Sequence, residues 1–521
     1  MVEELSFAPF SATIGACPGD DPPMHGLDIT VVSLYLLGTL VLGLYLTRRV
    51  HSAPDFFIAG RRLPFWAIGM SVVVSDIGAL EMVGGTAAAY RYGVAQANYE
   101  WIGCIPAMVV GGLLFTPLYW RSGVFSIPEY LGRRYGAAVQ GIQALVWLVF
   151  LSAALGVFFQ ASAEMLLGVL GWPRWLSVGL TAAVVAVYTT GGGLEAVVLT
   201  DVIQCVILFI GGLALAAVGL SRVGGLAGLR AGLARRGPAT RHHLQLLMPA
   251  GLRDGAGKPT GYPWPGIILG LGMVLSPAYW VGNQAIVQRT LGARDEWSAR
   301  SSMVFGALLK TVVPVAFVLP GLLGLVLLGD RDPNGVYPQL IGELLPVGMR
   351  GLMYAAFLAA LMSSVDSYTN SAATIFTRDI YGRFLARDRD DRHYLRAGRL
   401  ASLGVIAFGV ACVPVVARYG TIYDAFQSFL SLFQGPTLAL ILSGLLWRRA
   451  SPAGGLAGLL VGLAAAIWFK AVLKLHYLYI AWWSFLAALV ALLLVSSVTR
   501  SLPADQLRGL VLGDDGEEQA P

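Results

Sequence analysis

Long apolar stretches separated by short polar connections dominate the pattern of this chain. The stretches run to about 20 residues, which is enough for a helix to cross the hydrocarbon core of a bilayer. They recur from one end of the chain to the other, so the pattern predicts an all-α integral membrane protein with about 13 transmembrane helices. The predicted spans lie near residues 27–47, 64–89, 98–120, 138–169, 174–190, 195–221, 263–288, 303–328, 346–380, 396–417, 422–446, 453–473 and 476–498.

Two of these spans are interrupted by helix-breaking and polar residues well inside the membrane. The second span carries SDIGALEMVGG at residues 75–85, and the seventh carries LSPAYWVGNQ at residues 275–284. Irregular backbone at membrane depth is tolerated only where it lines a cavity or is buried in protein. Broken spans at corresponding places in two halves are typical of inverted-repeat transporters, which bind substrate and ions there. The two breaks lie five spans apart, which favours a five-plus-five inverted repeat that begins at the second span.

The ninth span carries a polar face. At the helical spacings i, i+3, i+4 and i+7 stand Ala360, Ser363, Ser364 and Ser367. Asp366 lies at the edge of this face, and a carboxylate inside a membrane is a functional candidate because it needs a cavity or a partner. Hydroxyl and carboxylate oxygens suit a hard cation such as Na⁺. Helix packing alone explains one or two serines but explains a whole face with an aspartate poorly.

Backbone carbonyls freed at the first break would complete this cation site. The carbonyls near Val74 and Ile77 are the candidates, together with the serine hydroxyls. Asp201, in the sixth span, is a further intramembrane carboxylate. It is expected to pair with Asp366 and Ser367 at the far end of the serine face, which would make a second Na⁺ site.

Other buried polar residues are candidates for contact with a solute. Lys310 lies in an apolar span, where it either bonds a polar substrate or neutralises Glu81 or Glu100. Glu100 itself either binds substrate or sits at the membrane interface, and Gln427 is an amide without an evident structural need. Aromatic rings that would stack on a sugar or close gates, although each alone is more often packing, are Tyr99, Tyr279, Trp280 and Tyr423.

Composition and charge exclude several classes of protein. Mean hydropathy is +0.69, and charged residues make up only 13% of the chain, against roughly 25% in soluble domains. The net charge of +6 comes from arginines at the ends of spans, so it does not indicate binding to nucleic acid. The four cysteines have no paired spacing that would indicate disulfides or a metal site. No nucleophile–base motif or H-x-x-x-H pair indicates an enzyme.

The arginines also predict an orientation. Arginine-rich connections fall on alternate loops, which the positive-inside rule places in the cytoplasm; they are Arg48 to Arg62, Arg133/Arg134, Arg289 to Arg300, Arg378 to Arg399, and Arg448/Arg449. The N-terminus is then outside and the C-terminus is in the cytoplasm. The expected organisation is an external tail (1–26), a leading helix (27–48), a first repeat (64–221), an external loop (222–262), a second repeat (263–447), two further helices (452–498) and a cytoplasmic tail (499–521).

From about residue 27 to about residue 475 the chain resembles the sodium/solute symporter family, in particular its sodium/glucose cotransporter branch. The motifs that carry the resemblance are DFFIAGRRLP (55–64), SIPEYLGRRYG (126–136), YTTGGGLEAV (188–197) with Asp201, QAIVQR (284–289), and the stretch from Met362-Ser363-Ser364 to Arg378-Asp379-Ile380-Tyr381. The resemblance implies a five-plus-five inverted repeat of the amino-acid-transporter type with one extra leading helix. It also implies alternating access driven by a sodium gradient.

The resemblance further implies roles for individual residues. The Na⁺ ligands would be Val74, Ile77, Ala360, Ser363 and Ser364, and a second Na⁺ used by some members would lie near Asp201, Ser363, Asp366 and Ser367. The ligand contacts would be Asp76, Glu81, Glu100, Ser276, Lys310 and Gln427, with gates at Tyr99, Tyr279 and Tyr423.

Three positions depart from the pattern of the sugar branch. Asp76 stands where sugar transporters usually carry asparagine, Glu81 where they carry glutamine or histidine, and Asp366 where a small hydroxyl residue is usual. Carboxylates accept hydrogen bonds from sugar hydroxyls, but they also suit an amino sugar, another cationic solute or proton coupling.

The chain is therefore expected to be a symporter in the inner membrane of a bacterium, with Na⁺ as the coupling ion and a sugar or polyol as its solute. The alternative is a Na⁺- or H⁺-coupled importer of an amino sugar, amino acid or other nitrogenous solute. Its expected partners are the solute, Na⁺ and the bilayer, without nucleic acid or an obligate protein partner.

Overall fold

The computed structural model describes residues 25–47, 52–78, 80–170, 172–237, 240–251, 262–416 and 422–512. Nearly all of the predicted external tail and part of the 222–262 loop lie outside these residues, as does the end of the predicted cytoplasmic tail. Within the described residues all regular elements are helices, and β-structure is limited to two isolated bridges. The predicted all-α class is confirmed.

The helices follow one another without intervening strands, with α denoting α-helices and η the 3₁₀ and π segments. The first part of the chain forms α1 (Gly26–Thr47), α2 (Ala53–Ile58), η1 (Ala59–Arg61), α3 (Phe65–Asp76), η2 (Leu80–Gly85), α4 (Thr86–Tyr92), η3 (Gly93–Ala97), η4 (Tyr99–Cys104), α5 (Ile105–Val110), η5 (Gly111–Phe115), α6 (Thr116–Ser122), α7 (Ile127–Tyr135) and α8 (Ala137–Leu170). The middle part forms α9 (Arg174–Val223), α10 (Gly225–Arg235), η7 (Gly266–Leu275), α11 (Ser276–Gly282), α12 (Gln284–Leu291), α13 (Glu296–Lys310), α14 (Val313–Leu327), η8 (Pro333–Gly335) and α15 (Val336–Leu344). The last part forms α16 (Met349–Thr374), η9 (Ile375–Leu385), α17 (Asp391–Val416), α18 (Ile422–Ser431), α19 (Gln434–Leu446), α20 (Pro452–Ala471), α21 (Tyr477–Val498) and α22 (Ala504–Leu507).

Seven helices in the described residues are long and apolar enough to cross a membrane, and nine are if each of two bent pairs counts as one span. The bent pairs are the two interrupted spans. Phe65–Asp76 meets Leu80–Ala97 at 57°, and Gly266–Gly282 meets Gln284–Leu291 at 48°. Both predicted breaks are therefore confirmed, because glycine, proline and polar side chains stop the regular hydrogen-bond ladder at these points.

Two boundaries differ from the expected spans. The fifth and sixth predicted spans follow each other without a loop in α9, where two helices meet at a kink at Gly193 (φ 58°, ψ −157°); the apolar segments Arg174–Val187 and Gly193–Val223 lie on either side of it. A Cβ at this glycine would lie 2.6 Å from the Phe56 carbonyl oxygen, so both the positive φ and the close contact require glycine. The eleventh predicted span is divided into α18 and α19 near Phe433.

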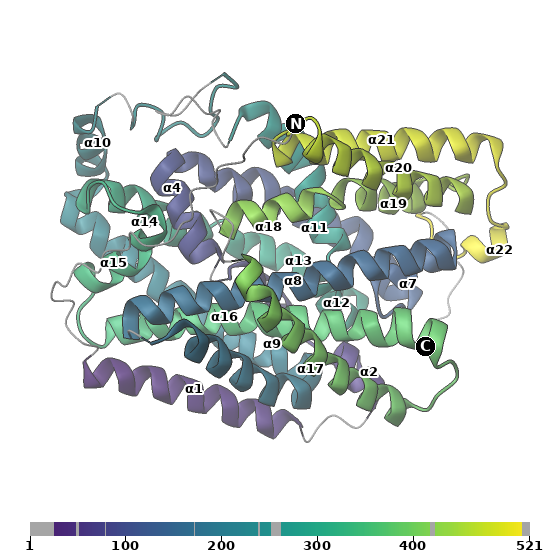
Figure 1. The fold of residues 1–521 in the computed structure, drawn as a ribbon, viewed down its shortest axis with the longest axis horizontal. Coiled ribbons are helices and arrows are strands. Elements are labelled where there is room, and N and C mark those ends of the chain that lie inside the picture. The colour runs from purple at the N-terminus through teal and green to yellow at the C-terminus, as the bar shows by residue number, and fades with distance from the viewer. Residues whose placement is uncertain are drawn as a thin grey trace, which may run out of the picture.

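The serine-bearing helix α16 lies at the centre of the fold. It packs against α1, α3, α8, α9 and α17, and Figure 1 shows it running between α8 and α1 through the middle of the molecule. Every residue from Ala359 to Thr374 is buried. Its hydroxyls are therefore surrounded by protein rather than by lipid. The helices α20 and α21 pack on α19 at one side of the molecule, away from α16 (Figure 1).

Candidate functional site

The first break lies at the end of α3, where the backbone leaves the helical conformation at Ile77 (φ −81°, ψ 68°). In a continuous helix the Gly78 amide would donate to the Val74 carbonyl and the Glu81 amide to the Ile77 carbonyl. Instead, the Gly78 amide donates to Asp76 O at 2.9 Å and the Glu81 amide donates to Gly78 O at 3.1 Å. The helical donors of the Val74 and Ile77 carbonyls are therefore bonded elsewhere.

The serine face of α16 lies directly against this break. A Cβ at Gly78 would lie 2.5 Å from Ser364 Oγ, so the close approach needs a residue without a side chain. Ser364 Oγ donates to Ala360 O at 3.1 Å and to Ser75 O at 3.4 Å. Ser363 Oγ lies 3.1 Å from Ser75 Oγ. The fold thus brings the predicted Na⁺ ligands of α16 next to the broken end of α3, which carries the other two predicted ligands, Val74 and Ile77.

A cavity of about 70 Å³ opens beside the break. Five of the six predicted substrate residues and three of the four predicted gates line it, namely Asp76, Glu81, Glu100, Ser276, Gln427, Tyr99, Tyr279 and Trp280. Ser75 and Ser364 line the same cavity. The cavity therefore brings the residues predicted to bind the solute together with one predicted Na⁺ ligand, Ser364. The side chain of Tyr423 lies outside the described residues.

Lys310, the sixth predicted substrate residue, lies behind the cavity wall and is fully buried. Its ammonium group pairs with the Asp76 carboxylate and with Glu100 Oε2, the latter at 2.9 Å. The two carboxylate side chains keep 13% and 9% of their surface exposed. Glu81 takes a different partner, because its Oε2 accepts the Gly78 amide at 3.1 Å. Of the two neutralisation partners considered, the structure pairs Lys310 with Glu100.

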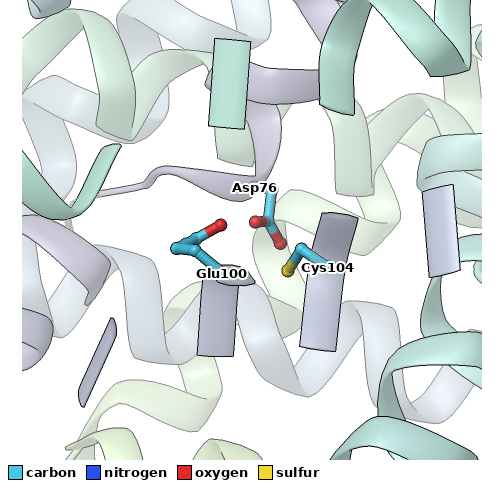
Figure 2. A group of neighbouring side chains, drawn as sticks. All are labelled: Asp76, Glu100 and Cys104. Carbon is cyan, nitrogen blue, oxygen red and sulfur yellow. The ribbon is translucent and has the colours of Figure 1, made fainter. Parts of the chain in front are cut away.

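Figure 2 shows Asp76, Glu100 and Cys104 converging on one point. Their possible ligand atoms all lie within 4.8 Å of one another, and two carboxylates with a thiolate are a plausible set for a metal ion. The Lys310 ammonium group already forms ion pairs with both carboxylates, however. Its positive charge opposes a second cation at the same oxygens. The cluster therefore fits an ammonium group better than a metal ion.

The residues of the predicted second Na⁺ site surround an arginine. Asp201 on α9 and Ser367 on α16 both bond the guanidinium of Arg289, and Asp201 does so at 3.3 Å. Arg289 is only 1% exposed. The sequence places Arg289 at the start of an arginine-rich connection, whereas in the structure it lies within α12 (Gln284–Leu291), all of whose residues are buried. Asp366 is buried on the same helix as Ser367.

Three residues near these sites were not found from the sequence. Arg289 and Cys104 are two of them, and the third is Gln434, whose side chain lines the cavity. Its Nε2 is buried without a hydrogen-bond partner in the part of the chain that the structure describes. For Arg289 the available signal was its place directly after the second break, on the same helix as Gln284 and Gln288.

The chain is similar to known transporters over most of its length. The Sodium:solute symporter family model matches residues 56–462. A sodium/glucose cotransporter of Vibrio parahaemolyticus is 33% identical over 481 residues, which cover 86% of this chain and 86% of the relative. A sodium/myo-inositol cotransporter of Mus musculus is 30% identical over 550 residues, covering 93% of this chain and 75% of the relative.

A solved structure has the same fold. It is the substrate-bound, outward-open state of a Na⁺-coupled sialic acid symporter, which superposes with a TM-score of 0.80 at 21% sequence identity. The match covers 92% of this chain and 99% of that one. At this identity the likeness establishes the shared helical architecture and does not extend to the solute.

Proposed function

Because the chain belongs to the sodium:solute symporter family, and Na⁺ is thus its coupling ion, we propose that it imports a sugar or polyol through a bacterial inner membrane. One observation carries the proposal. A single cavity is lined both by Ser364 of the serine face and by Glu81, Glu100 and Gln427, which are suited to bind hydroxyl groups. An ion bound at Ser364 would therefore influence the affinity for a solute bound by Glu81, Glu100 and Gln427.

The proposed Na⁺ site consists of the carbonyls of Val74, Ile77 and Ala360 with the hydroxyls of Ser363 and Ser364. It is supported by the diverted helical donors at the break and by the contact of Ser75 with both serines. A cation there would hold the broken end of α3 against α16. Each charge that moves down a potential of about 100 mV releases about 2.3 kcal/mol, which would drive accumulation of the solute.

The proposed solute contacts are Asp76, Glu81, Glu100, Ser276, Lys310 and Gln427, with aromatic gates at Tyr99, Tyr279, Trp280 and Tyr423. The relatives named for glucose and myo-inositol transport support a neutral polyhydroxylated solute. Carboxylates, an amide and an ammonium group together accept and donate hydrogen bonds to neighbouring hydroxyls. The unpartnered Gln434 amide adds a donor at the same wall.

One observation favours a second candidate, an amino sugar. Three carboxylates, Asp76, Glu81 and Glu100, line the cavity, and Lys310 pairs with only two of them. A solute that brings its own positive charge would balance Glu81. The two candidates differ only in the charge of the solute, so one experiment separates them.

The proposed architecture has 13 spans, counting the seven long apolar helices, the two bent pairs, the three shorter apolar helices and α16. In this arrangement a leading helix (27–48) precedes a first repeat (64–221) and a second repeat (263–447). The two helices of 452–498 follow. Arginines on alternate connections support an external N-terminus and a cytoplasmic C-terminus.

The test is uptake into proteoliposomes of labelled hexoses, inositols, amino sugars, amino acids and monocarboxylates, with an inward Na⁺ gradient or with K⁺ in its place. Na⁺-dependent uptake of a neutral sugar or polyol is expected. Uptake of amino sugars alone would replace the first candidate by the second. Sugar uptake that does not respond to Na⁺ would contradict the proposed ion site and would direct attention to protons at Asp76, Glu81 or Asp366.

Ser364→Ala is the variant for the ion site. It is expected to abolish Na⁺ dependence, because it removes a ligand that faces the cavity. The matched control is Ser497→Ala, since Ser497 is exposed near the end of α21 and its hydroxyl bonds only its own helix at Leu494 O. Unchanged Na⁺ dependence in Ser364→Ala would place the ion elsewhere.

A further inference from the structure

A second and larger cavity lies away from the solute site, where η9 packs against α7, α8 and α17. Its volume is about 320 Å³. Two sequence motifs to which the proposed function assigns no role supply much of its lining, the segment 126–136 and the stretch that ends at Tyr381; their lining residues include Glu129, Arg133, Arg378 and Asp379. The arginine pattern places this cavity on the side of the protein that is predicted to be cytoplasmic.

The cavity is lined by three guanidinium groups and two carboxylates, those of Arg133, Arg378, Arg383, Glu129 and Asp379. Both carboxylates already accept hydrogen bonds from protein donors. Glu129 Oε1 accepts from Arg133 Nη2 at 2.6 Å. Asp379 accepts from Ser126 Oγ at 2.7 Å and from Gln140 Nε2 at 2.9 Å. The carboxylates are therefore engaged within the protein, and the excess positive charge is carried by the two remaining arginines.

Arg378 is held by aromatic rings. Its guanidinium carbon lies 4.2 Å from the centre of the Phe125 ring, 5.3 Å from that of Tyr394 and 5.5 Å from that of Phe57. Such contacts stabilise the charge but supply no oxygen to accept from the N–H groups. Within the part of the chain that the structure describes, Arg378 Nε is buried without a hydrogen-bond partner. The rings thus fix a guanidinium at the cavity while a buried donor remains to be satisfied.

A phosphate group matches these donors. The planar fork of a guanidinium binds two phosphate oxygens at once, which a carbonyl or a hydroxyl cannot offer. Arg383, which is exposed, adds a second cation at the same cavity. The connection from there to Arg399 contains five further arginines against three aspartates. Basic pockets between transmembrane helices on the cytoplasmic side bind the head groups of anionic lipids.

An exposed apolar strip begins beside the cavity. Phe384 and Leu385 directly follow Arg383 in η9, and both are exposed. A Cβ at Gly141 would lie 3.4 Å from the Phe384 ring, so this ring rests on α8. One and two turns further along α8, Leu145 and Val149 are exposed as well. A lipid with its phosphate at Arg378 would lay an acyl chain along this strip, whereas a free phosphate would make no use of it.

We propose that this cavity binds the phosphate head group of an anionic phospholipid, with Arg378 as the contact to the phosphate and Arg383 as the second cation. The inference goes beyond the proposed function, because none of the proposed solute or Na⁺ residues lines this cavity. It assigns a second ligand to the protein. Since η9 continues directly from α16, the bound lipid would touch the helix that carries the serine face.

The first test is thermal unfolding of the delipidated protein in detergent, with phosphatidylglycerol, phosphatidylcholine or inorganic phosphate added. Phosphatidylglycerol is expected to raise the melting temperature, because a ligand bound only by the folded state stabilises it. Phosphatidylcholine carries its own positive charge and is expected to raise it much less. An equal rise with both lipids would overturn the inference. A rise with inorganic phosphate that equals the rise with phosphatidylglycerol would assign the cavity to a soluble anion and overturn the lipid as its ligand.

Arg378→Gln identifies the site. Loss of its charge-assisted hydrogen bonds is expected to weaken binding of phosphatidylglycerol by about tenfold or more, measured by native mass spectrometry of the lipid-bound protein. The matched control is Arg392→Gln, which removes the same charge from the same connection at an exposed position outside the cavity lining. It is expected to bind the lipid as the wild type does. Unchanged binding in Arg378→Gln, or equal weakening in both variants, would overturn the inference.

Arg383→Gln keeps the proposal testable if Arg378→Gln does not fold, because Arg383 is exposed and its loss leaves the packing of the rings intact. Its affinity for phosphatidylglycerol is expected to fall several-fold, and an unchanged affinity would contradict the proposed role of the second cation and overturn the inference. These measurements need neither solute nor Na⁺. A failure of lipid binding therefore leaves the proposed symport intact, and a failure of the uptake experiments leaves lipid binding unchanged.

Discussion

Two buried clusters in this protein each contain one basic side chain paired with carboxylate groups. They differ in their exposure to water, in the groups that the basic side chain contacts, and in whether the cation is a lysine or an arginine. Lys310 forms ion pairs with two carboxylates that line a cavity and remain 13% and 9% exposed. Arg289 bonds one carboxylate and three hydroxyls, and Arg289 and Asp201 are 1% and 0% exposed. The first cluster can exchange a protein partner for a solute hydroxyl, whereas the second has no solvent to exchange with.

The choice of basic residue follows the same division. Lysine carries a compact charge on a flexible stem, which suits a group that must change partners during transport. Arginine presents five donors in a rigid plane, which suits a group that holds several helices in register. Arg289 contacts residues 218, 214, 88 and 78 positions away in the sequence. Burial of the basic side chain alone therefore does not distinguish a binding charge from a positioning charge, whereas the exposure of its carboxylate partners does.

The largest effect is expected from removing the cation at the cavity. Lys310→Met leaves Asp76 and Glu100 buried without their partner, which costs about 3–5 kcal/mol for a broken buried pair. Solute uptake in proteoliposomes is expected to disappear and the melting temperature to fall. The matched control is Lys474→Met at an exposed position, which should change neither. Adding Asp76→Asn to Lys310→Met should recover part of the stability; an unchanged melting temperature in Lys310→Met would contradict the pairing.

A smaller effect on transport is expected from removing the carboxylate of the Arg289 cluster. Asp201→Asn keeps the shape and leaves the hydroxyls of Ser71, Ser75 and Ser367 to accept from Arg289. The free energy of unfolding is expected to fall by about 3–5 kcal/mol, because the guanidinium stays buried without its counter-ion, while the KM for the solute is expected to stay unchanged. Asp330→Asn is the control, because Asp330 pairs with Arg236 while 98% exposed. A changed KM with unchanged stability would place Asp201 at the solute site.

Glu81→Gln tests whether the charge of Glu81 contributes to recognition of the solute. Glu81 lies outside the Lys310 pairs and accepts the Gly78 amide, so losing its charge should leave the fold intact. The KM for a neutral sugar is expected to change by less than about tenfold, which corresponds to about 1.4 kcal/mol. The KM for an amino sugar should rise by more than the KM for the neutral sugar. Parallel uptake curves for the two solutes measure the difference, with the exposed Glu343→Gln as control. Equal shifts for both solutes would remove Glu81 from charge recognition.

The smallest effect is expected at the gate. The hydroxyl of Tyr99 on η4 bonds the hydroxyl of Tyr477 on α21. Tyr477→Phe removes this neutral hydrogen bond, which is worth about 0.5–1.5 kcal/mol, and so a KM change of only a few-fold is expected from uptake measurements. A complete loss of uptake would mean that α21, outside the proposed repeats, takes part directly in transport.

Much of the candidate site could be predicted from the sequence because its signals are local. The serine face follows from a spacing of three and four residues, and the break at Gly78 follows from the glycines and carboxylates beside it. Both features depend on neighbours within one or two turns of helix. The position of Lys310 inside an apolar span was also visible in the sequence. That its ammonium group pairs with Asp76 rather than with Glu81 could not be predicted.

The sequence by itself determined the membrane class, the two broken helices and the oxygen-rich face, since hydropathy and helix breaking act over short stretches of chain. Only the tertiary structure decided which charges meet. Arg289 looked like one more arginine at a helix end, and α12 instead carries it into the protein beside Asp201 on α9 and Ser367 on α16. A buried charge must find a partner, and the packing of distant helices determines which partner lies within reach.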